Sequence, residues 1–160
     1  PSALTQTLTW QTCAFEALAP ADLYRALQLR QNVFILEQAC LYPDLDDLDQ
    51  QAMHFLCWQG HELVAYQRCL PPGISYRESS IGRIIVTPAV RGIQLGRQLV
   101  QRGIDYNLAQ WPQYDIKIGA QAHLQPFYSS LGFATVGEEY LEDGIMHAPM
   151  LYRRSAQPGT

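Results

Sequence analysis

The chain has 160 residues, of which 48% are hydrophobic and 16% are charged, and its formal net charge is −4. This length predicts a single domain over residues 1–160, with residues 1–6 as a loose end, that buries about two thirds of its unfolded surface. The acidic balance argues against a protein that binds the nucleic-acid backbone, which needs a basic stripe. No apolar run approaches a membrane span and no signal-peptide pattern is present, so we expect a cytoplasmic protein without a membrane partner.

The cysteines stand at positions 13, 40, 57 and 69. None forms a C-x-x-C pair and no histidine lies at ligand spacing from one, so the sequence predicts reduced thiols. The aspartate-rich segment 41–51 lacks the internal glycine and the closing glutamate of a calcium loop. We therefore expect no metal site.

The first third of the chain predicts a strand and then a helix. Residues 8–15 have the composition and alternation of a strand, and Pro20 opens a helical pattern. The segment 29–38 ends this helix or breaks it into two pieces. The predicted apolar face comprises Leu23, Ala26, Leu27, Val33 and Leu36.

The rest of the chain alternates strands with helices. Residues 54–59 and 62–70 flank Gly60-His61 as a hairpin, and the apolar run at 84–86 ends before Thr87-Pro88. The later elements are a helix carrying Leu95, Leu99, Ile104 and Leu108, a strand at 114–120, a helix at 123–131 capped by Gly132, and strands at 133–138 and 145–152 around a turn at 142–144. The order predicts fold class α/β (α+β mixed sheet), a central mixed sheet of about six or seven strands with helices on both faces.

The turn between the apolar run and the next helix is the first candidate binding site. Gly92 and Gly96 let a backbone come close to a ligand, and the following helix offers unpaired N–H groups and the positive end of its dipole. This combination predicts an anion site suited to a pyrophosphate. Its residues are Arg91, Gly92, Ile93, Gln94, Leu95, Gly96 and Arg97.

The same turn resembles the acyl-CoA loop of the GNAT superfamily of N-acetyltransferases, whose usual pattern is Arg/Gln-x-x-Gly-x-Gly/Ala after a strand. Arg91 and Gly96 match, and Gln94 stands where the middle glycine is usual. Residues 125–133, QPFYSSLGF, are similar to the second GNAT signature, FY-x-x-x-GF. Segments at 30–46, 119–125 and 142–147 resemble the ElaA-like branch of the superfamily, which also lacks the middle glycine.

This resemblance implies a GNAT-like acyl-CoA N-acyltransferase fold and a transfer of an acetyl group from acetyl-CoA to a primary amine of a small molecule or peptide. It implies that the strand ending at Val86 is splayed from its neighbour, so that a backbone N–H near Ile85 or Val86 serves as oxyanion donor. Gln121 stands where many GNAT proteins place an asparagine, and we expect it to contact the cofactor.

Acyl transfer from a thioester to an amine needs a neutral amine, and the departing thiolate benefits from a proton. Tyr128 is the candidate acid, because a phenol with a reference pKa of about 10 keeps its proton at neutral pH. Glu37 and His147 are the candidate bases, with the aspartates at 44, 46, 47 and 49 as alternatives. The amine could also lose its proton through water or before it binds.

Arg30 and the acidic segment 41–51 each have two interpretations. Arg30 holds a substrate carboxylate or pairs with a loop aspartate, and we prefer the pairing. The aspartates form a solvated loop or an acidic rim that attracts a cationic amine.

Two other functions compete with N-acetyl transfer. The segment 29–34 faintly resembles the acyl-homoserine lactone synthases, which share this fold. A CoA-binding sensor without turnover is a candidate from a different class. An amine substrate is the expected partner, no nucleic acid is expected, and a homodimer is kept open.

Overall fold

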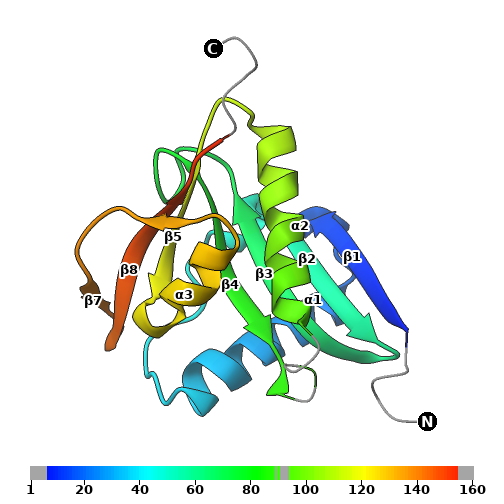
Figure 1. The fold of residues 1–160 in the computed structure, drawn as a ribbon. Helices are drawn as coiled ribbons and strands as arrows, with labels where there is room; N and C mark the ends of the chain where they lie inside the picture. Colours follow the sequence, from blue (N-terminus) through cyan, green and yellow to red (C-terminus); the bar gives the residue numbers. More distant parts are fainter. Residues whose placement is uncertain (1–6, 89, 91–93, 155–160) are drawn as a thin grey trace.

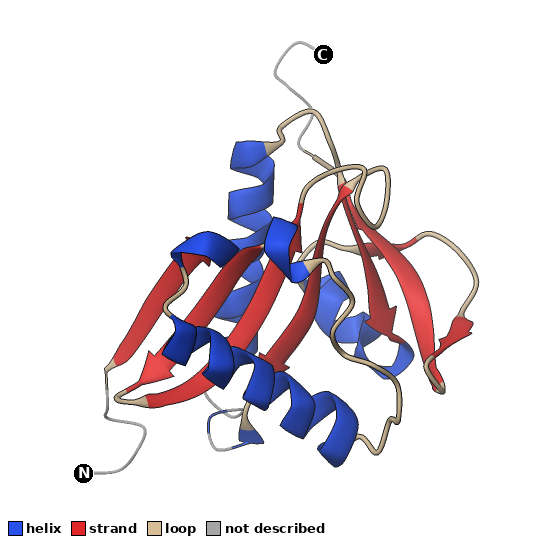
Figure 2. Ribbon diagram, turned by 180° about the vertical axis from the view of Figure 1, so that it is seen from behind, coloured by secondary structure: helices blue, strands red, loops and turns tan. Residues whose placement is uncertain are grey.

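The computed structural model describes residues 7–88, 90 and 94–154. A mixed sheet forms the centre of the molecule, and helices cover both of its faces, as Figures 1 and 2 show from opposite sides. The strands are β1 (Leu8–Ala14), β2 (Met53–Gln59), β3 (Glu62–Leu70), β4 (Ser79–Val86), β5 (Ile116–Gln121), β6 (Ala134–Thr135), β7 (Tyr140–Glu142) and β8 (Ile145–Tyr152).

The strand order along the sheet is β1-β2-β3-β4-β5-β8-β6, and β7 pairs with β8 beside this path. The pair β4–β5 is parallel, and the remaining pairs of described strands are antiparallel. A crossover through a helix joins the parallel pair, as parallel pairing requires. The predicted mixed sheet with helices on both faces is confirmed.

Helix α1 (Pro20–Arg30) covers one face of the sheet, and α2 (Leu95–Gln110) and α3 (Gln125–Ser130) cover the other. Pro20 occupies the first turn of α1, where its missing N–H costs nothing. No helix of the described ranges is long and apolar enough to cross a membrane. The short helical segments are η2 (Phe15–Ala17), η3 (Gln31–Glu37), η4 (Asp49–Gln51) and η6 (Ala122–Leu124).

The two faces of the sheet bury separate apolar clusters. The larger cluster lies under α2 and α3, and Leu95, Leu99 and Ile104 reach it from α2 with no exposed surface. The smaller cluster lies under α1, where Ala26 packs with Tyr66. The apolar face predicted for the α2 helix is therefore the face that is buried.

The helix that begins at Pro20 continues into a π-helical segment, η3. Its wider turn changes the angle between successive side chains, so a face extrapolated at 3.6 residues per turn drifts. Val33 is still buried, but Leu36 is 64% exposed. The prediction that Leu36 shares the buried face is wrong for this reason.

The hairpin around Gly60-His61 is confirmed, and the C-terminal strands differ from the prediction. The strand expected over 133–138 is only the two residues of β6, and β7 was not predicted, so the sheet has eight strands rather than six or seven. Asp143 and Gly144 both have positive φ, 52° and 77°, and join β7 to β8. An Asp-Gly pair with this conformation is the usual signal of a two-residue β-hairpin. The segment predicted as a simple turn is therefore the loop of a hairpin.

Candidate active site

Strands β4 and β5 diverge soon after they begin. They pair only through Ser79↔Ile116 and Ser80↔Lys117, although β4 continues to Val86 and β5 to Gln121. The wedge between them opens into a cleft of about 450 Å³. Its walls include residues 81–84 of β4 and 118–121 of β5. This is the separation that the family resemblance implied for the strand ending at Val86.

Arg83 forms a bulge in β4 on the edge of this cleft. Tyr66 pairs with Ile85 and Arg68 pairs with Gly82, so two residues of β4 stand opposite one residue of β3. Arg83 takes up the extra length with a left-handed backbone, φ 52°. A bulge re-aims the side chain at its centre, and such strained positions gather at functional sites.

Tyr128 lies in the cleft wall on α3 and is 6% exposed. Pro126 sits in the first turn of this helix, and Gly132 follows its end with φ 111°, as predicted. The ring packs edge-on against Phe127 and Phe133, at centroid distances of 5.1 and 5.9 Å. Burial raises the pKa of Tyr128 to about 12, and no described residue forms a hydrogen bond with its hydroxyl. The phenol is therefore protonated at neutral pH.

His147 and Gln121 are direct partners across the β5–β8 pair, and both line the cleft. The Nδ1 of His147 lies 2.7 Å from the carbonyl oxygen of Ile145. A carbonyl can only accept, so Nδ1 carries a hydrogen, and Nε2 is the ring nitrogen that can accept a proton when the ring is neutral. The Nε2 atom lies 3.9 Å from Oε2 of Glu142. The ring stacks on Tyr140 at 5.9 Å between centroids.

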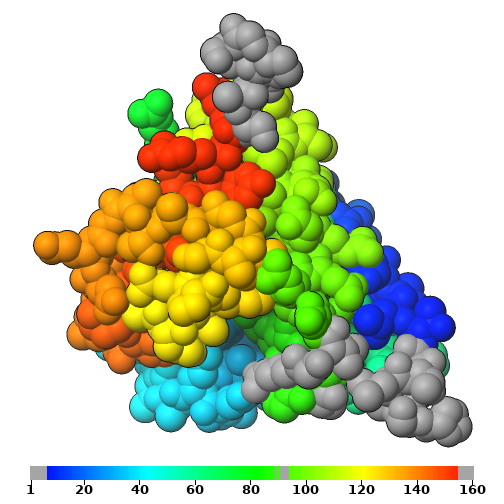
Figure 3. Space-filling model, in the orientation of Figure 1, coloured from blue at the N-terminus to red at the C-terminus, as the bar shows by residue number. Residues whose placement is uncertain are grey.

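The first turn of α2 lies between the end of β4 and α3. Gln94 is the residue before the helix and is left-handed, φ 59° and ψ 25°, a conformation that a glycine adopts without strain. A β-carbon on Gly96 would lie 3.6 Å from Phe127 Cζ and 3.7 Å from Val86 Cγ2. Arg97 donates from Nη1 to Ser130 Oγ at 2.6 Å, and Figure 3 shows α2 and α3 meeting on this face. Leu95 is fully buried, and Arg91, Gly92 and Ile93 lie outside the described residues.

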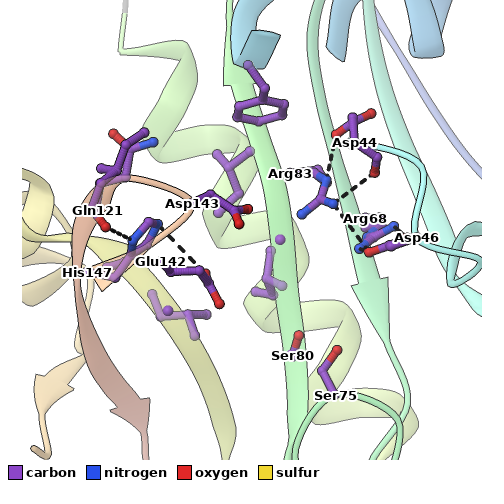
Figure 4. Close-up of a pocket in the computed structure, with 18 of the residues that line it drawn as sticks. Asp44, Asp46, Arg68, Ser75, Ser80, Arg83, Gln121, Glu142, Asp143 and His147 are labelled. Atoms are coloured by element: carbon purple, nitrogen blue, oxygen red, sulfur yellow. Dashed lines mark hydrogen bonds and ion pairs between the residues drawn. The ribbon is translucent and has the colours of Figure 1, made fainter. Parts of the chain in front are cut away.

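The loop after η3 is fixed by three arginines from three different elements. Arg30 donates to Asp44 at 2.8 Å and to Asp49 at 2.7 Å, and Arg68 donates to Asp46 and Asp49. Arg83 donates to Asp44 at 2.7 Å. Figure 4 shows the cleft side of this network. The preferred pairing of Arg30 with loop aspartates is confirmed, and Arg30 is only 1% exposed, so a substrate carboxylate does not reach it.

Neither interpretation of the aspartates as a group describes the structure. Asp44 and Asp49 are buried, which contradicts a solvated loop, and arginines neutralise Asp44, Asp46 and Asp49, which contradicts an acidic rim. Burial alone would raise the pKa of Asp46, but the hydrogen bond and charge of Arg68, together with Arg83, lower it to about 2. Burial would also raise the pKa of Asp49, but the hydrogen bonds and charges of Arg30 and Arg68 outweigh it and lower this pKa.

The predicted site residues thus fall into three groups. Tyr128, Gln121 and His147 line one cleft. Glu37 is exposed and is not part of the cleft lining, although its neighbour Gln38 is, and Gln121 donates to Gln38 at 3.5 Å. The third group also lies outside the cleft lining and forms the end of β4 and the start of α2. Its members are Ile85, Val86, Gln94, Leu95, Gly96 and Arg97.

Sequence reasoning missed Arg68, Arg83 and Glu142, which line the cleft. Arg68 and Arg83 each interrupt an apolar strand, and a charged residue inside such a run is a usable signal, because burial of a charge requires a partner. Glu142 was assigned to a turn and to the segment 142–147 that resembles the ElaA-like branch, but not to the site. In the described ranges, no group of three or more His, Cys, Asp or Glu side chains could hold a metal ion.

Comparison with known proteins agrees with this geometry. Residues 21–154 match the model of the acetyltransferase (GNAT) domain family. Protein ElaA of Escherichia coli K12 is 43% identical over 145 residues, which cover 89% of this chain and 95% of that protein. The crystal structure of Escherichia coli ElaA superposes with a TM-score of 0.86 at 41% identity, over 92% of this chain and all of that one.

Two further solved structures bear on the competing functions. An acyl-CoA N-acyltransferase from Pseudomonas aeruginosa superposes with a TM-score of 0.87 at 38% identity, over 92% of this chain and all of that one. The acyl-homoserine lactone synthase LasI superposes with a TM-score of 0.76, over 94% of this chain and 92% of that one, but at 12% identity. The likeness to the synthase shows a shared fold alone.

Proposed function

Since this chain belongs to the GNAT acetyltransferase domain family, we propose that it transfers an acetyl group from acetyl-CoA to a primary amine of a small molecule or peptide. One observation carries the proposal: a buried, protonated Tyr128 and a His147 whose Nδ1 is bonded to a backbone carbonyl line the same cleft, where two parallel strands diverge. This pairing of a proton donor with a proton acceptor is what acyl transfer to an amine needs.

The surroundings of the cleft suit an acyl-CoA. Gln94 keeps the left-handed backbone expected of a glycine, and Gly96 leaves one position in the first turn of a 16-residue helix without a side chain. The N–H groups and dipole of that helix favour a pyrophosphate. Residues 91–97 would hold it, with Gln121 and the backbone near Ile85 and Val86 toward the pantetheine arm. When bound, acetyl-CoA supplies the activated acetyl group and a thiol leaving group.

Tyr128 is the proposed acid. Tyr128 lines the cleft, and a pKa of about 12 keeps its hydroxyl protonated throughout the neutral range. A phenol in this state gives a proton to a departing thiolate and cannot act as a base. The aromatic packing with Phe127 and Phe133 fixes the ring, so the hydroxyl is presented in one place.

His147 is the preferred base among the candidates. Its Nδ1–H is fixed by the carbonyl of Ile145, so Nε2 is the atom that takes a proton from the incoming amine. The loop aspartates are weaker candidates, because arginines lower the pKa of Asp46 and of Asp49. A carboxylate with a lowered pKa has less tendency to take a proton from an amine. Glu37 remains a candidate only through a water, since it lies outside the cleft lining.

We also propose that the protein works in the cytoplasm. All four cysteines are free thiols, which suits a reducing compartment.

The proposal is tested by CoA thiol release from acetyl-CoA with a panel of primary amines. We expect amine-dependent release from the wild type, and a kcat about a hundred- to ten-thousandfold lower in Tyr128→Phe. Acetyl-CoA affinity should be unchanged, because only one hydroxyl is lost. Tyr24→Phe makes the same change at a 66% exposed position and should keep the wild-type rate.

Two results would overturn parts of this proposal. Acetyl-CoA binding without release across the panel would favour a CoA sensor. Wild-type turnover in Tyr128→Phe would leave that residue with a structural role only.

A further inference from the structure

Arg83 has one half of its guanidinium held and the other half free. Nε donates to Asp44 Oδ1 at 2.7 Å, and Nη2 donates to the Asp44 carbonyl oxygen at 2.9 Å and to Asp46 Oδ2 at 3.3 Å. Nη1 makes no hydrogen bond to any residue that the structure describes, and 28% of the side chain is exposed. A rigid, oriented group with two unused N–H donors therefore stands in the cleft wall.

The bulge gives this side chain its direction. In a regular strand Arg83 would point away from the face to which its neighbour Gly82 points. With φ 52° at Arg83, its guanidinium instead reaches Asp46, which Arg68 also contacts from β3. Figure 4 shows Arg83, Arg68 and the two aspartates together on one side of the cleft.

Gly82 leaves open space in the cleft wall. Apart from its chain neighbours Ile81 and Arg83, no residue has an atom within 4 Å of the place where a β-carbon on Gly82 would stand, and the backbone there is not left-handed. Gly82 is the cross-strand partner of Arg68, and such partners point to the same face of a sheet. The space therefore opens on the side of the arginines, and no local backbone requirement explains the glycine.

The charges of the network decide which ligand group suits this space. Three guanidinium groups already face the three carboxylates of Asp44, Asp46 and Asp49. A ligand carboxylate would bring an additional negative charge close to Asp44 and Asp46, where like charges repel. An ammonium group offers nothing for Nη1 to donate to. A neutral carbonyl oxygen accepts the hydrogen bonds and adds no charge.

We propose that Nη1 of Arg83 and the space over Gly82 form an acceptor subsite that binds an amide carbonyl oxygen of the amine substrate. The acceptor is then an amine of the kind found at the amino end of a peptide or in an amino acid amide. This inference rests on the proposed function, because it assumes that the acceptor amine enters this cleft.

Three matched compounds test the subsite. Alaninamide, alanine and ethylamine share the amine and its carbon neighbours, and differ in bearing an amide, a carboxylate or neither. Binding of each to the protein is measured by NMR titration without acetyl-CoA, and KM and kcat are measured with it. The NMR titration measures binding at the subsite even if none of the compounds is acetylated.

Arg83→Lys keeps a cation near Asp44 but removes Nη1, and Gly82→Val fills the open space. Each should weaken alaninamide binding and raise its KM roughly ten- to hundredfold, the effect of losing a hydrogen bond from a charged group. Binding and KM for ethylamine should stay within about twofold. Arg30→Lys is the matched control, since Arg30 belongs to the same network but does not line the cleft, and it should keep the wild-type preference.

The outcomes separate the subsite from the proposed function. Alaninamide that binds through Arg83 but is never acetylated supports the subsite and counts against the transfer reaction. The subsite is overturned if the wild type binds none of the compounds or prefers alanine. It is also overturned if Arg83→Lys leaves the preference for alaninamide over ethylamine unchanged, or if Arg30→Lys removes it equally.

Discussion

The hydroxyl oxygen of Tyr140 lies 2.5 Å from the point where a β-carbon on Gly119 would stand. The hydroxyl of Tyr76 lies 3.3 Å from the same point. Both tyrosines reach over β5 because position 119 has no side chain. Tyr140 stacks on the ring of His147. Gly119 therefore helps to set the position of His147, the proposed base, through Tyr140.

Gly119→Ala should therefore displace Tyr140. The crowding is at the far end of a side chain, so we expect a loss of about 1–3 kcal/mol in the free energy of unfolding, as for other overpacked positions. Tyr140→Phe removes the crowded oxygen and should restore most of the loss in the double variant. Denaturant unfolding of the wild type, both single variants and the double variant measures this coupling. Strictly additive losses would show that the two residues do not crowd each other.

Gly103→Ala in α2 should destabilise the protein, against the usual trend. In an open helix the change gains about 1 kcal/mol. Here the new carbon would lie 2.7 Å from Gln67 Nε2 and 3.0 Å from Ile81 Cδ1. Gln67 is fully buried and donates to the Leu99 carbonyl at 2.8 Å, so moving it costs about 1–3 kcal/mol for an unpaired amide. A higher melting temperature in Gly103→Ala would contradict this packing.

The arginine–aspartate network should make folding sensitive to acid. The pKa values of Asp46 and Asp49 are lowered in the folded protein, that of Asp46 to about 2. Their contribution is present above the unfolded pKa of about 4 and is lost as the pH falls from there through the folded pKa. Unfolding free energies measured from pH 5 to pH 2 should decline, and Asp46→Asn should flatten that decline.

Asp47→Asn is the control for this experiment, because Asp47 is exposed. It should leave the pH dependence as in the wild type. If Asp46→Asn and Asp47→Asn gave the same slope, the ion pairs of Asp46 would not be the cause.

Local signals in the sequence were enough for much of the fold. Gly132 caps α3 with the positive φ that only glycine adopts without strain, and Gly60 turns the β2–β3 hairpin. The exposure of Leu36 could not be predicted, because it results from the π-helical segment η3. Such a segment has no sequence signature comparable to a proline or a helix cap. Strand β7 was missed because its three residues carry little pattern of their own.

The cleft was only partly readable for a different reason. Tyr128, Gln121 and His147 were found through motif resemblance, and they do lie together. The partners of Arg83 and Arg68 are 19 to 39 residues away in the chain, so no local spacing connects them to Asp44, Asp46 and Asp49. The fold decides which aspartate each arginine neutralises. It therefore also decides the net charge on the side of the cleft that Arg68, Arg83, Asp44 and Asp46 form.

The first turn of α2 gives a prediction that separates the effect of side-chain size from the effect of charge at Gly96. The backbone of Gly96 is not left-handed, and a β-carbon there would make only ordinary contacts with Phe127 and Val86. Gly96→Ala should therefore fold normally and bind acetyl-CoA with little change. Gly96→Gln and Gly96→Glu have nearly the same size, so a larger loss of affinity in Gly96→Glu measures repulsion between a carboxylate and a bound pyrophosphate. We expect a further loss of about tenfold, because a single charge at a helix N-terminus acts on an anion at the same place. The difference should shrink as salt is raised. Equal affinities of the glutamine and glutamate variants for acetyl-CoA at low salt would mean that the pyrophosphate does not lie at this turn.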